Sequence, residues 1–414
     1  MHDVVVIGAG ASGVFFSLVL KSLNSFADIL ILEKNDKLGK KLLMTGNGRC
    51  NLGNKENLLE NYYSSSSLSA FKDKLEVKDY DFLDILPSDL ENYYEYLNAF
   101  GILIKKEDNS SRLYPYSNQT LTVCKSFERA LKEKGVKVKY NYDVKKVEND
   151  NDIFIINDEI KCKKLVVATG GVSYPKTGST GFGHEILKSF NHTITKLYPS
   201  LTYLNTDYKY IKELAGVRFD SYVSLSVDGF IEKSEKGQVQ FTKDSLSGIV
   251  VFNLSRNVSK YLDDGKKVKL ILNLVTNYSG FELKDYLKGF YSYKVEDALS
   301  TIVNNKLALV VAKELNVSGL MVKQLKENEL EGLCFNLQNM YFNIVGVGGF
   351  DAAQITNGGA LLSEFTNGLE SKKTCGLYAI GEVLDVDGKC GGYNLSWAFT
   401  SALEAAKDLS NKIN

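Results

Sequence analysis

The chain has 414 residues, 44% hydrophobic and 24% charged, which is typical of a globular protein with two or three domains. Lys+Arg and Asp+Glu both number 50, so the formal net charge is zero and argues against a nucleic-acid or polybasic membrane-binding protein. No apolar run reaches the length of a membrane span, and the N-terminus lacks the basic start of a secretory signal.

The first predicted strand leads into a glycine-rich turn. Residues 4–7 are Val-Val-Val-Ile, which predicts a parallel strand buried on both faces. Gly8, Gly10 and Gly13 follow at G-x-G-x-x-G spacing, ahead of an apolar stretch with helical periodicity. In such a turn the first glycine permits the bend, the second lets the backbone approach a pyrophosphate, and the third lets the helix pack on the strand. This setting predicts dinucleotide binding rather than an ordinary glycine turn.

A second apolar run, at 29–32, ends in Glu33, about twenty residues after the glycines. An acid at this position can receive a ribose hydroxyl, and it favours a free 2′-hydroxyl over a 2′-phosphate. FAD and NAD both meet this condition, whereas NADP at this site does not.

The loop after Glu33 contains the sequence Thr-Gly-Asn-Gly-Arg-Cys-Asn at 45–51. Two glycines in a short polar run can bring the backbone close to a flat ligand. A fixed guanidinium suits anionic or carbonyl groups, so Arg49 is predicted to contact cofactor or substrate rather than solvent alone. Cys50 is expected to be a small buried residue rather than a redox thiol.

A further buried strand is predicted at 164–168, and Thr169, Gly170 and Gly171 follow it. A turn of small residues after a buried strand is a place where a nucleotide can approach a doubly wound sheet closely. The next loop, at 173–183, is rich in Gly, Ser and Thr and carries Tyr174. It is expected either to cover the cofactor or to form the hinge into the next domain.

The pattern changes over residues 195–345, which are predicted to form an inserted substrate-side domain. Within it, 195–279 and 329–345 are expected to be β-rich and 280–328 helical. Residues 1–194 and 346–414 would then be the two parts of a cofactor-binding domain.

The C-terminal stretch returns to that cofactor domain. A buried strand ends at Gly381 and Glu382, where a second carboxylate can reach a polyhydroxyl chain. Gly392, Tyr393 and Asn394 then open a helix whose N-terminus can hold negative charge. A reduced isoalloxazine ring carries such charge at N1 and O2.

Taken together, the motifs at 8–13, 45–51, 168–175, 381–382 and 391–394 resemble those of the bacterial BaiN/YhiN-like family of FAD-dependent oxidoreductases, also labelled aminoacetone oxidase family flavoproteins. The resemblance covers nearly the whole chain. It implies noncovalent FAD in an α/β, doubly wound Rossmann-like domain, interrupted by a β-barrel-like insert with a helical subdomain. In that family the segment at 345–350 is a return strand into the FAD domain.

The resemblance also assigns FAD contacts: the glycine turn to the pyrophosphate, Glu33 to the adenosine ribose, Arg49 and Asn51 to the flavin, and Glu382 to the ribityl chain. Residues 392–394 would contact the pyrimidine edge of the ring. The full set of expected cofactor contacts is Gly8, Ala9, Gly10, Ala11, Ser12, Gly13, Glu33, Lys34, Lys41, Arg49, Asn51, Val144, Ala168, Thr169, Gly170, Gly381, Glu382, Gly392, Tyr393 and Asn394.

The expected reaction passes a hydride from NADH or NADPH through FAD to an organic acceptor, such as the activated C=C bond of an enone. Arg49 could polarise the carbonyl and Tyr174 could donate the proton, with a packing role as the alternative for the tyrosine. No second nucleotide domain is visible, so NAD(P)H would visit the substrate cleft transiently. Two alternatives stay open: a flavin oxidase that uses oxygen, and a flavin-binding redox sensor without turnover.

The expected partners are a small-molecule substrate and NAD(P)H as a transient donor, with no nucleic acid and no membrane. The six cysteines are scattered without a C-x-x-C pair or a histidine cluster, which favours a reducing, cytoplasmic location and no metal site.

Overall fold

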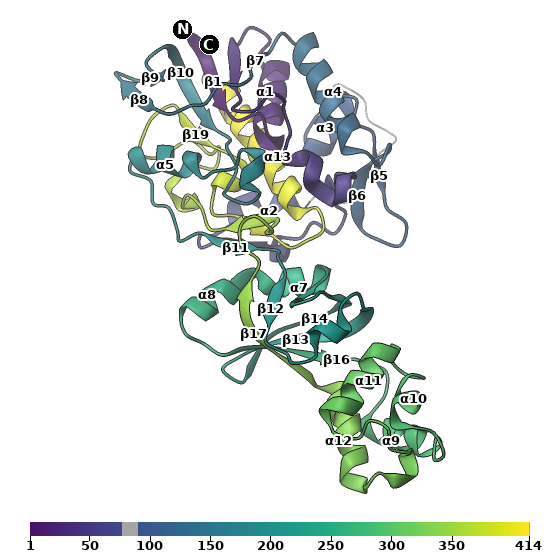
Figure 1. The fold of residues 1–414 in the computed structure, drawn as a ribbon. Coiled ribbons are helices and arrows are strands. Elements are labelled where there is room, and N and C mark those ends of the chain that lie inside the picture. Colours follow the sequence, from purple (N-terminus) through teal and green to yellow (C-terminus); the bar gives the residue numbers. More distant parts are fainter. Residues whose placement is uncertain (77–89, 414) are drawn as a thin grey trace. The chain divides into compact units, whose positions relative to one another are not determined.

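The computed structural model describes residues 1–76 and 90–413, and the chain divides into two units (Figure 1). Unit 1 consists of Met1–Tyr198 and Gln354–Asn414, and unit 2 is Pro199–Ala353. The sequence patterns put the insert at 195–345. Within the described ranges, none of the helices combines the length and the apolar character needed to cross a membrane.

A seven-stranded sheet of order β7-β2-β1-β10-β9-β8, with β19 paired to β10, forms the centre of unit 1. Strands β1, β2, β10, β19 and β7 run parallel to one another, so their carboxyl ends meet at one edge, whereas β9 is antiparallel to β10. The predicted Rossmann-like α/β fold is confirmed. The strands are β1 (His2–Ile7), β2 (Ile29–Leu32), β7 (Lys137–Lys139), β8 (Val147–Asp150), β9 (Ile153–Ile156), β10 (Ile160–Val167) and β19 (Leu377–Ala379).

Two long helices, α1 (Ala11–Leu23) and α13 (Tyr393–Ser410), lie side by side in unit 1 (Figure 1). Just beyond α1, the Asn24 amide donates a hydrogen bond to the carbonyl of Ile413, just beyond α13. The two carboxyl ends are therefore together, the helices run parallel, and both begin at the same edge of the sheet.

Shorter elements complete unit 1, and they place the loops around that edge. The helices are α2 (Lys72–Leu75), α3 (Tyr93–Ala99), α4 (Thr120–Glu133) and α5 (Phe182–Ser189), with short 3-10 turns that include η1 (Leu42–Gly48), η4 (Pro175–Thr177) and η8 (Gly381–Val383). The strands are β3 (Gly53–Asn54), β4 (Tyr62–Tyr63), β5 (Ile104–Lys106), β6 (Arg112–Pro115), β18 (Ile355–Asn357) and β20 (Asp387–Gly388). Strand β11 (Tyr198–Ser200) lies where the chain leaves unit 1.

Unit 2 is a closed barrel of order β12-β15-β14-β13-β16-β17 with a helical part that has its own core. The predicted β-barrel-like insert with a helical subdomain is thus confirmed. The barrel strands are β12 (Leu204–Thr206), β13 (Arg218–Val227), β14 (Phe230–Phe241), β15 (Ser245–Ser247), β16 (Val268–Asn273) and β17 (Met340–Val347). The helices are α6 (Ile211–Leu214), α7 (Ile249–Leu254), α8 (Val258–Asp263), α9 (Gly280–Lys288), α10 (Val295–Leu299), α11 (Asn305–Glu314) and α12 (Glu327–Gln338).

Two expectations for the insert were wrong. Residues 329–338 are helical rather than β-rich, because Leu330, Leu333 and Leu337 recur at helical spacing and are buried in the helical core. The segment at 345–350 begins as the end of β17, where Val347 pairs with Leu204, so it closes the barrel instead of returning to the sheet of unit 1.

Candidate functional site

The glycine turn lies at the carboxyl end of β1. A Cβ at Gly8, whose φ is 109°, would be 2.5 Å from the Ala168 carbonyl oxygen, and a Cβ at Gly13 would be 2.1 Å from the Gly8 carbonyl oxygen. At Gly10 no heavy atom of residues 1–76 or 90–413 lies within 4 Å of such a Cβ. Two glycines are therefore required by close packing, whereas the third presents its backbone to open space.

The two parallel helices begin without side-chain caps. The N-cap residues are Gly10 for α1 and Gly392 for α13, and neither supplies a side-chain hydrogen bond. A Cβ at Gly381, in the segment that leads to α13, would be 2.7 Å from Ser12 Oγ in the first turn of α1. Two sets of first-turn N–H groups, each at the positive end of a helix dipole, thus face the same edge, an arrangement suited to a ligand with negative charge.

Glu33 is fixed beside the glycine turn, at the end of β2. Its side chain is buried, Oε2 accepts a hydrogen bond from the Ala9 N–H at 2.7 Å, and Oε1 accepts from the backbone N–H and the side-chain Nδ2 of Asn35 at 2.8 and 2.6 Å. These donors hold the carboxylate toward the turn, as the ribose-binding prediction requires.

Three predicted contact residues come together at the start of η8. Lys41 Nζ lies 2.6 Å from Glu382 Oε2, and both side chains are about four-fifths buried, with 22% and 21% exposed. Glu382 Oε1 accepts a hydrogen bond from the Thr356 N–H at 2.9 Å. A Cβ at Gly170 would be 3.8 Å from Glu382 Oε2, so the turn after β10 borders the same carboxylate.

Asn51 carries a buried polar atom for which the described residues supply no partner. Its Oδ1 forms no hydrogen bond with any of them, and a Cβ at Gly392 would be 2.8 Å from it. The atom therefore lies at the start of α13. Because an unpaired buried acceptor is costly, this position fits a ligand that supplies a hydrogen-bond donor.

The predicted residues at the start of α13 have other contacts as well. The Asn394 amide accepts from the Gly388 N–H at 2.8 Å and donates to the Gly388 carbonyl at 2.9 Å, which closes the preceding loop. Tyr393 is buried. This burial, together with the smaller effect of the nearby Glu56 carboxylate, raises the pKa of its hydroxyl to about 12. Its phenol therefore stays protonated.

The Arg49 side chain contacts residues outside the group at the start of α13. Its Nη1 lies 2.8 Å from Glu107 Oε1, and its guanidinium carbon lies 4.0 Å from the ring centroid of Tyr114. The side chain is 39% exposed. The neighbouring Cys50 is fully buried, which raises the pKa of its thiol to about 12 and leaves it unsuited to redox chemistry.

Other predicted contacts spread around the edge of the sheet. Lys34 Nζ lies 3.4 Å from Asp143 Oδ1 with about half of each side chain exposed, so it faces solvent. Val144 is buried. Tyr174 lies in the 172–181 loop, and within the described ranges no hydrogen bond joins it to Arg49 or Asn51. Thr169 packs on α5, where a Cβ at Gly183 would overlap its hydroxyl. Ala11 opens α1 next to Gly10.

Two residues that hold the site were missed. Asn35 follows the predicted acid by two positions, and an Asn after a strand often hydrogen-bonds nearby backbone, so a signal was available. Thr356, which follows the insert in the sequence, donates its backbone N–H to Glu382. The residues around Thr356 carry no comparable signal.

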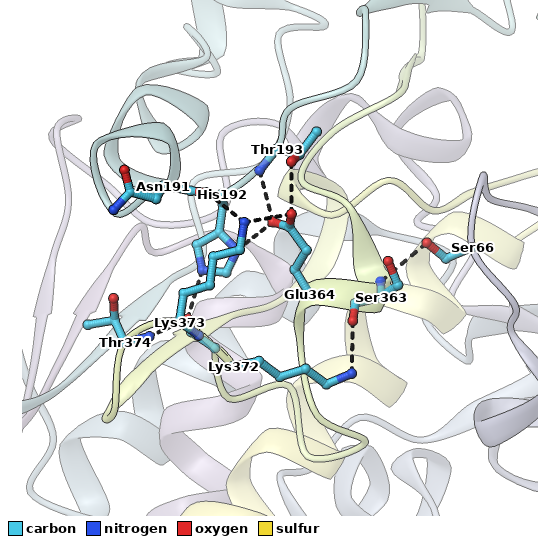
Figure 2. Close-up of polar contacts among 10 residues, drawn as sticks. Ser66, Asn191, His192, Thr193, Ser363, Glu364, Lys372, Lys373 and Thr374 are labelled. Atoms are coloured by element: carbon cyan, nitrogen blue, oxygen red, sulfur yellow. Dashed lines mark hydrogen bonds and ion pairs between the residues drawn. The ribbon is translucent and has the colours of Figure 1, made fainter.

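A second buried polar cluster lies in unit 1 (Figure 2). His192 Nδ1 lies 3.0 Å from Glu364 Oε2, and His192 Nε2 lies 2.8 Å from Ser371 Oγ. This is the order of a Ser-His-acid triad, but Ser371 Oγ already accepts the backbone N–H groups of Lys373 and Thr374 at 3.0 and 2.9 Å. With both lone pairs engaged, the serine is a poor nucleophile and the cluster serves as a structural clamp.

Charge stabilises this clamp. Burial acts to raise the pKa of Glu364, but hydrogen bonds from Lys373 and Thr193 outweigh it and lower that pKa to about 2. Lys373 Nζ lies 2.6 Å from Glu364 Oε1. Burial lowers the pKa of His192, whose ring stacks on Phe365 at 4.4 Å between centroids. The imidazole is therefore neutral at pH 7, beside an ionised carboxylate.

Comparison with known proteins gives one family match that spans nearly the whole chain. A family model described as HI0933-like protein Rossmann domain matches residues 2–408. The 3-dehydro-bile acid delta(4,6)-reductase of Clostridium scindens is 28% identical over 422 residues, 98% of this chain and 98% of that protein. The ribosomal RNA dihydrouridine synthase of Haemophilus influenzae is also 28% identical, over 99% of this chain and 98% of that protein. Among solved structures, an Escherichia coli quinol fumarate reductase FrdA chain matches at 12% identity with a TM-score of 0.46, over 99% of this chain and 70% of that chain.

Proposed function

This chain belongs to the HI0933-like Rossmann family, and we propose that it is an FAD-dependent enzyme that passes a hydride from NAD(P)H to an activated C=C bond. The family resemblance predicted from the motifs is confirmed, and with it the assignment to a family of flavoprotein oxidoreductases. The observation that carries the proposal of FAD is the pair of uncapped, parallel helices that begin at Gly10 and Gly392.

The residues around these helix starts fit FAD. The start of α1 would hold the pyrophosphate and Glu33 the adenosine ribose. Glu382, held by Lys41, would take a ribityl hydroxyl, and Asn51 Oδ1 would accept a donor from the flavin beside the start of α13. When bound, FAD supplies the hydride chemistry that amino-acid side chains cannot perform.

The names of the two curated relatives support the acceptor class. One protein is named as a reductase of a 3-dehydro-bile acid, in which a ketone is conjugated with C=C bonds. The other is named as a dihydrouridine synthase, and dihydrouridine is uridine with the C=C bond beside a carbonyl saturated. Saturation of a C=C bond that is conjugated with a carbonyl group adds one hydride and one proton, and both names are compatible with this chemistry. The small-molecule acceptor and the nucleoside acceptor are therefore two forms of one chemistry.

The chain's own residues would polarise the acceptor and supply the proton. We assign Arg49 to the carbonyl oxygen, where its fixed charge would stabilise the enolate that hydride addition produces. Tyr174 would return a proton to the α-carbon. In the net reaction NAD(P)H becomes NAD(P)⁺ and the acceptor gains one hydride and one proton.

Anaerobic visible absorbance of the purified protein tests this function directly. A flavin spectrum that bleaches on addition of NADH or NADPH is the expected result. A flavin spectrum that neither nucleotide bleaches would refute the proposed donor and favour the oxidase or the redox sensor. A protein that does not take up added FAD would refute the whole proposal.

The acceptor is tested with the reduced enzyme. A Δ4-3-ketosteroid and a uridine-containing RNA, added separately without oxygen, should distinguish the two forms of the chemistry by reoxidation of the flavin and by the mass of the product. Tyr174→Phe should slow reoxidation by the accepted substrate and leave bleaching by NAD(P)H unchanged. Arg49→Lys should have the same selective effect if the guanidinium contacts the carbonyl.

A further inference from the structure

The side chain of Asn35 joins three parts of the candidate site. Its Nδ2 donates to Glu33 Oε1 at 2.6 Å and to the Thr177 carbonyl oxygen at 3.0 Å. Its Oδ1 accepts a hydrogen bond from Lys40 Nζ at 3.1 Å. One amide group thus connects the predicted ribose acid, at the end of β2, with a loop that follows β10.

That loop, residues 172–181, crosses the edge of the sheet. It starts after β10 and reaches Asn35 after β2, and β1 lies between these two strands. The loop must therefore pass the end of β1, where Gly10 faces open space. Its beginning is held because the N–H groups of Val172 and Ser173 donate to Thr356 Oγ1 at 2.9 and 3.2 Å. Asn35 supplies the contact at the far end.

Asn35 also determines which acceptor of Glu33 stays available. Oε1 accepts two hydrogen bonds from Asn35, one from the backbone N–H and one from the side-chain Nδ2, whereas Oε2 accepts one, from the Ala9 N–H. A carboxylate oxygen accepts about two hydrogen bonds, so one acceptor position remains, on Oε2. The carboxylate is thereby oriented to receive a single hydroxyl beside the glycine turn.

We propose that Asn35 is a positioning residue for the adenosine end of FAD. It orients Glu33 toward one ribose hydroxyl and latches loop 172–181 over the bound nucleotide. This inference rests on the proposed function, because FAD is the ligand that the latch retains. Release of the cofactor then requires the hydrogen bond between Asn35 and Thr177 to open.

The first test is the rate at which FAD leaves the loaded protein, followed by flavin fluorescence after dilution. Asn35→Ala removes the whole amide, and Asn35→Asp removes both side-chain donors while keeping an acceptor for Lys40. Both variants should release FAD roughly 10- to 100-fold faster, the effect of losing a hydrogen bond to a charged group. The control, Lys40→Ala, removes the contact with Oδ1 and an ion pair with Asp36 but leaves both side-chain donors of Asn35 in place. It should release FAD at the wild-type rate.

The second test uses FAD-free protein and trypsin, because Lys176 is an exposed cleavage site within the loop. Cleavage after Lys176 should be faster in both Asn35 variants than in the wild type and in Lys40→Ala. Circular dichroism and thermal unfolding verify that the variants are folded.

The outcomes separate this inference from the proposed function. If the wild type binds no FAD, the proposed function fails and the cofactor role of Asn35 fails with it, while cleavage at Lys176 still decides whether Asn35 latches the loop. If the wild type binds FAD and the Asn35 variants release it at the wild-type rate, the inference is overturned and the proposed function stands. Faster cleavage with unchanged release likewise overturns the positioning role.

Discussion

Gly13→Ala and Gly10→Ala should separate folding from cofactor binding. A methyl group at Gly13 would lie 2.1 Å from the Gly8 carbonyl oxygen and 3.1 Å from the Ala168 Cβ. Neither neighbour can move without displacing β1 or β10, because one is backbone and the other is a Cβ. At Gly10 the same methyl group meets no heavy atom within 4 Å in the part of the chain that the structure describes.

The cost at Gly13 follows from these contacts. Overpacking typically costs 1–3 kcal/mol, and the rigid obstacle puts this site at about 3 kcal/mol. Replacing a helical Gly by Ala returns up to about 1 kcal/mol, so the net loss is about 2 kcal/mol. For a unit of this size, that loss lowers the melting temperature by roughly 4–8 °C.

Gly10→Ala should have the opposite profile. The φ of Gly10 is −78°, which alanine adopts without strain, so the free energy of unfolding should change by less than about 1 kcal/mol. Its methyl group would occupy the space assigned to the pyrophosphate, so FAD affinity should fall at least tenfold.

Thermal unfolding of FAD-free protein and fluorescence titration with FAD measure the two effects. The reasoning is refuted if Gly10→Ala lowers the melting temperature as much as Gly13→Ala. It is equally refuted if Gly10→Ala binds FAD like the wild type.

Three further changes test other parts of unit 1. The pKa of Glu364 is lowered to about 2 in the folded protein, so its stabilisation is complete above its ordinary value of 4.5 and is lost as the pH falls toward 2. Denaturant titrations at several pH values should show a loss of about 3 kcal/mol that Glu364→Gln abolishes. The lowered pKa of His192 acts in the same direction, and its contribution is lost as the pH falls below its ordinary value of 6.5. Asn51→Leu should stabilise FAD-free protein by about 1 kcal/mol, because it removes an unpaired buried acceptor, and should weaken FAD binding; unfolding with and without FAD checks both effects. Lys41→Met should leave Glu382 without its cation and reduce FAD affinity roughly tenfold in a fluorescence titration, and unchanged affinity would contradict the assigned ribityl contact.

Local sequence was enough to predict the elements around the glycine turn. The β-branched residues of β1 are buried on both faces, and the glycines that follow it lie where the strand passes into α1. The start of α13 was predictable for a related reason, since Gly392 precedes a long run of residues compatible with a helix. In these places the path of the backbone requires glycine, so the spacing of the glycines predicts where a turn or a helix start lies.

The side-chain contacts of the site could not be predicted in the same way. Lys41 meets Glu382 only because β2, β10 and β19 end at one edge, and the two residues are separated in sequence by the whole insert. The link from Asn35 to Thr177 likewise depends on the order of the strands. At α12 the apolar residues already recur at helical spacing. The prediction of a β-rich segment from 329 therefore ended the helical part of the insert too early in the sequence.

The pairing of β19 with β10 and the packing of α13 beside α1 have a consequence for synthesis of the chain. Unit 2 is one continuous segment, with its barrel and helical cores complete once residue 353 has been made. Unit 1 at that moment still lacks β19, so β10 has an open edge, and α1 lacks its neighbour. These contacts bring together segments from the two ends of the sequence. Their formation is slow because about two hundred residues, including the whole insert, separate β10 from β19. On the ribosome, the inserted unit is therefore the first to be complete, and the unit that begins the chain is the last to close.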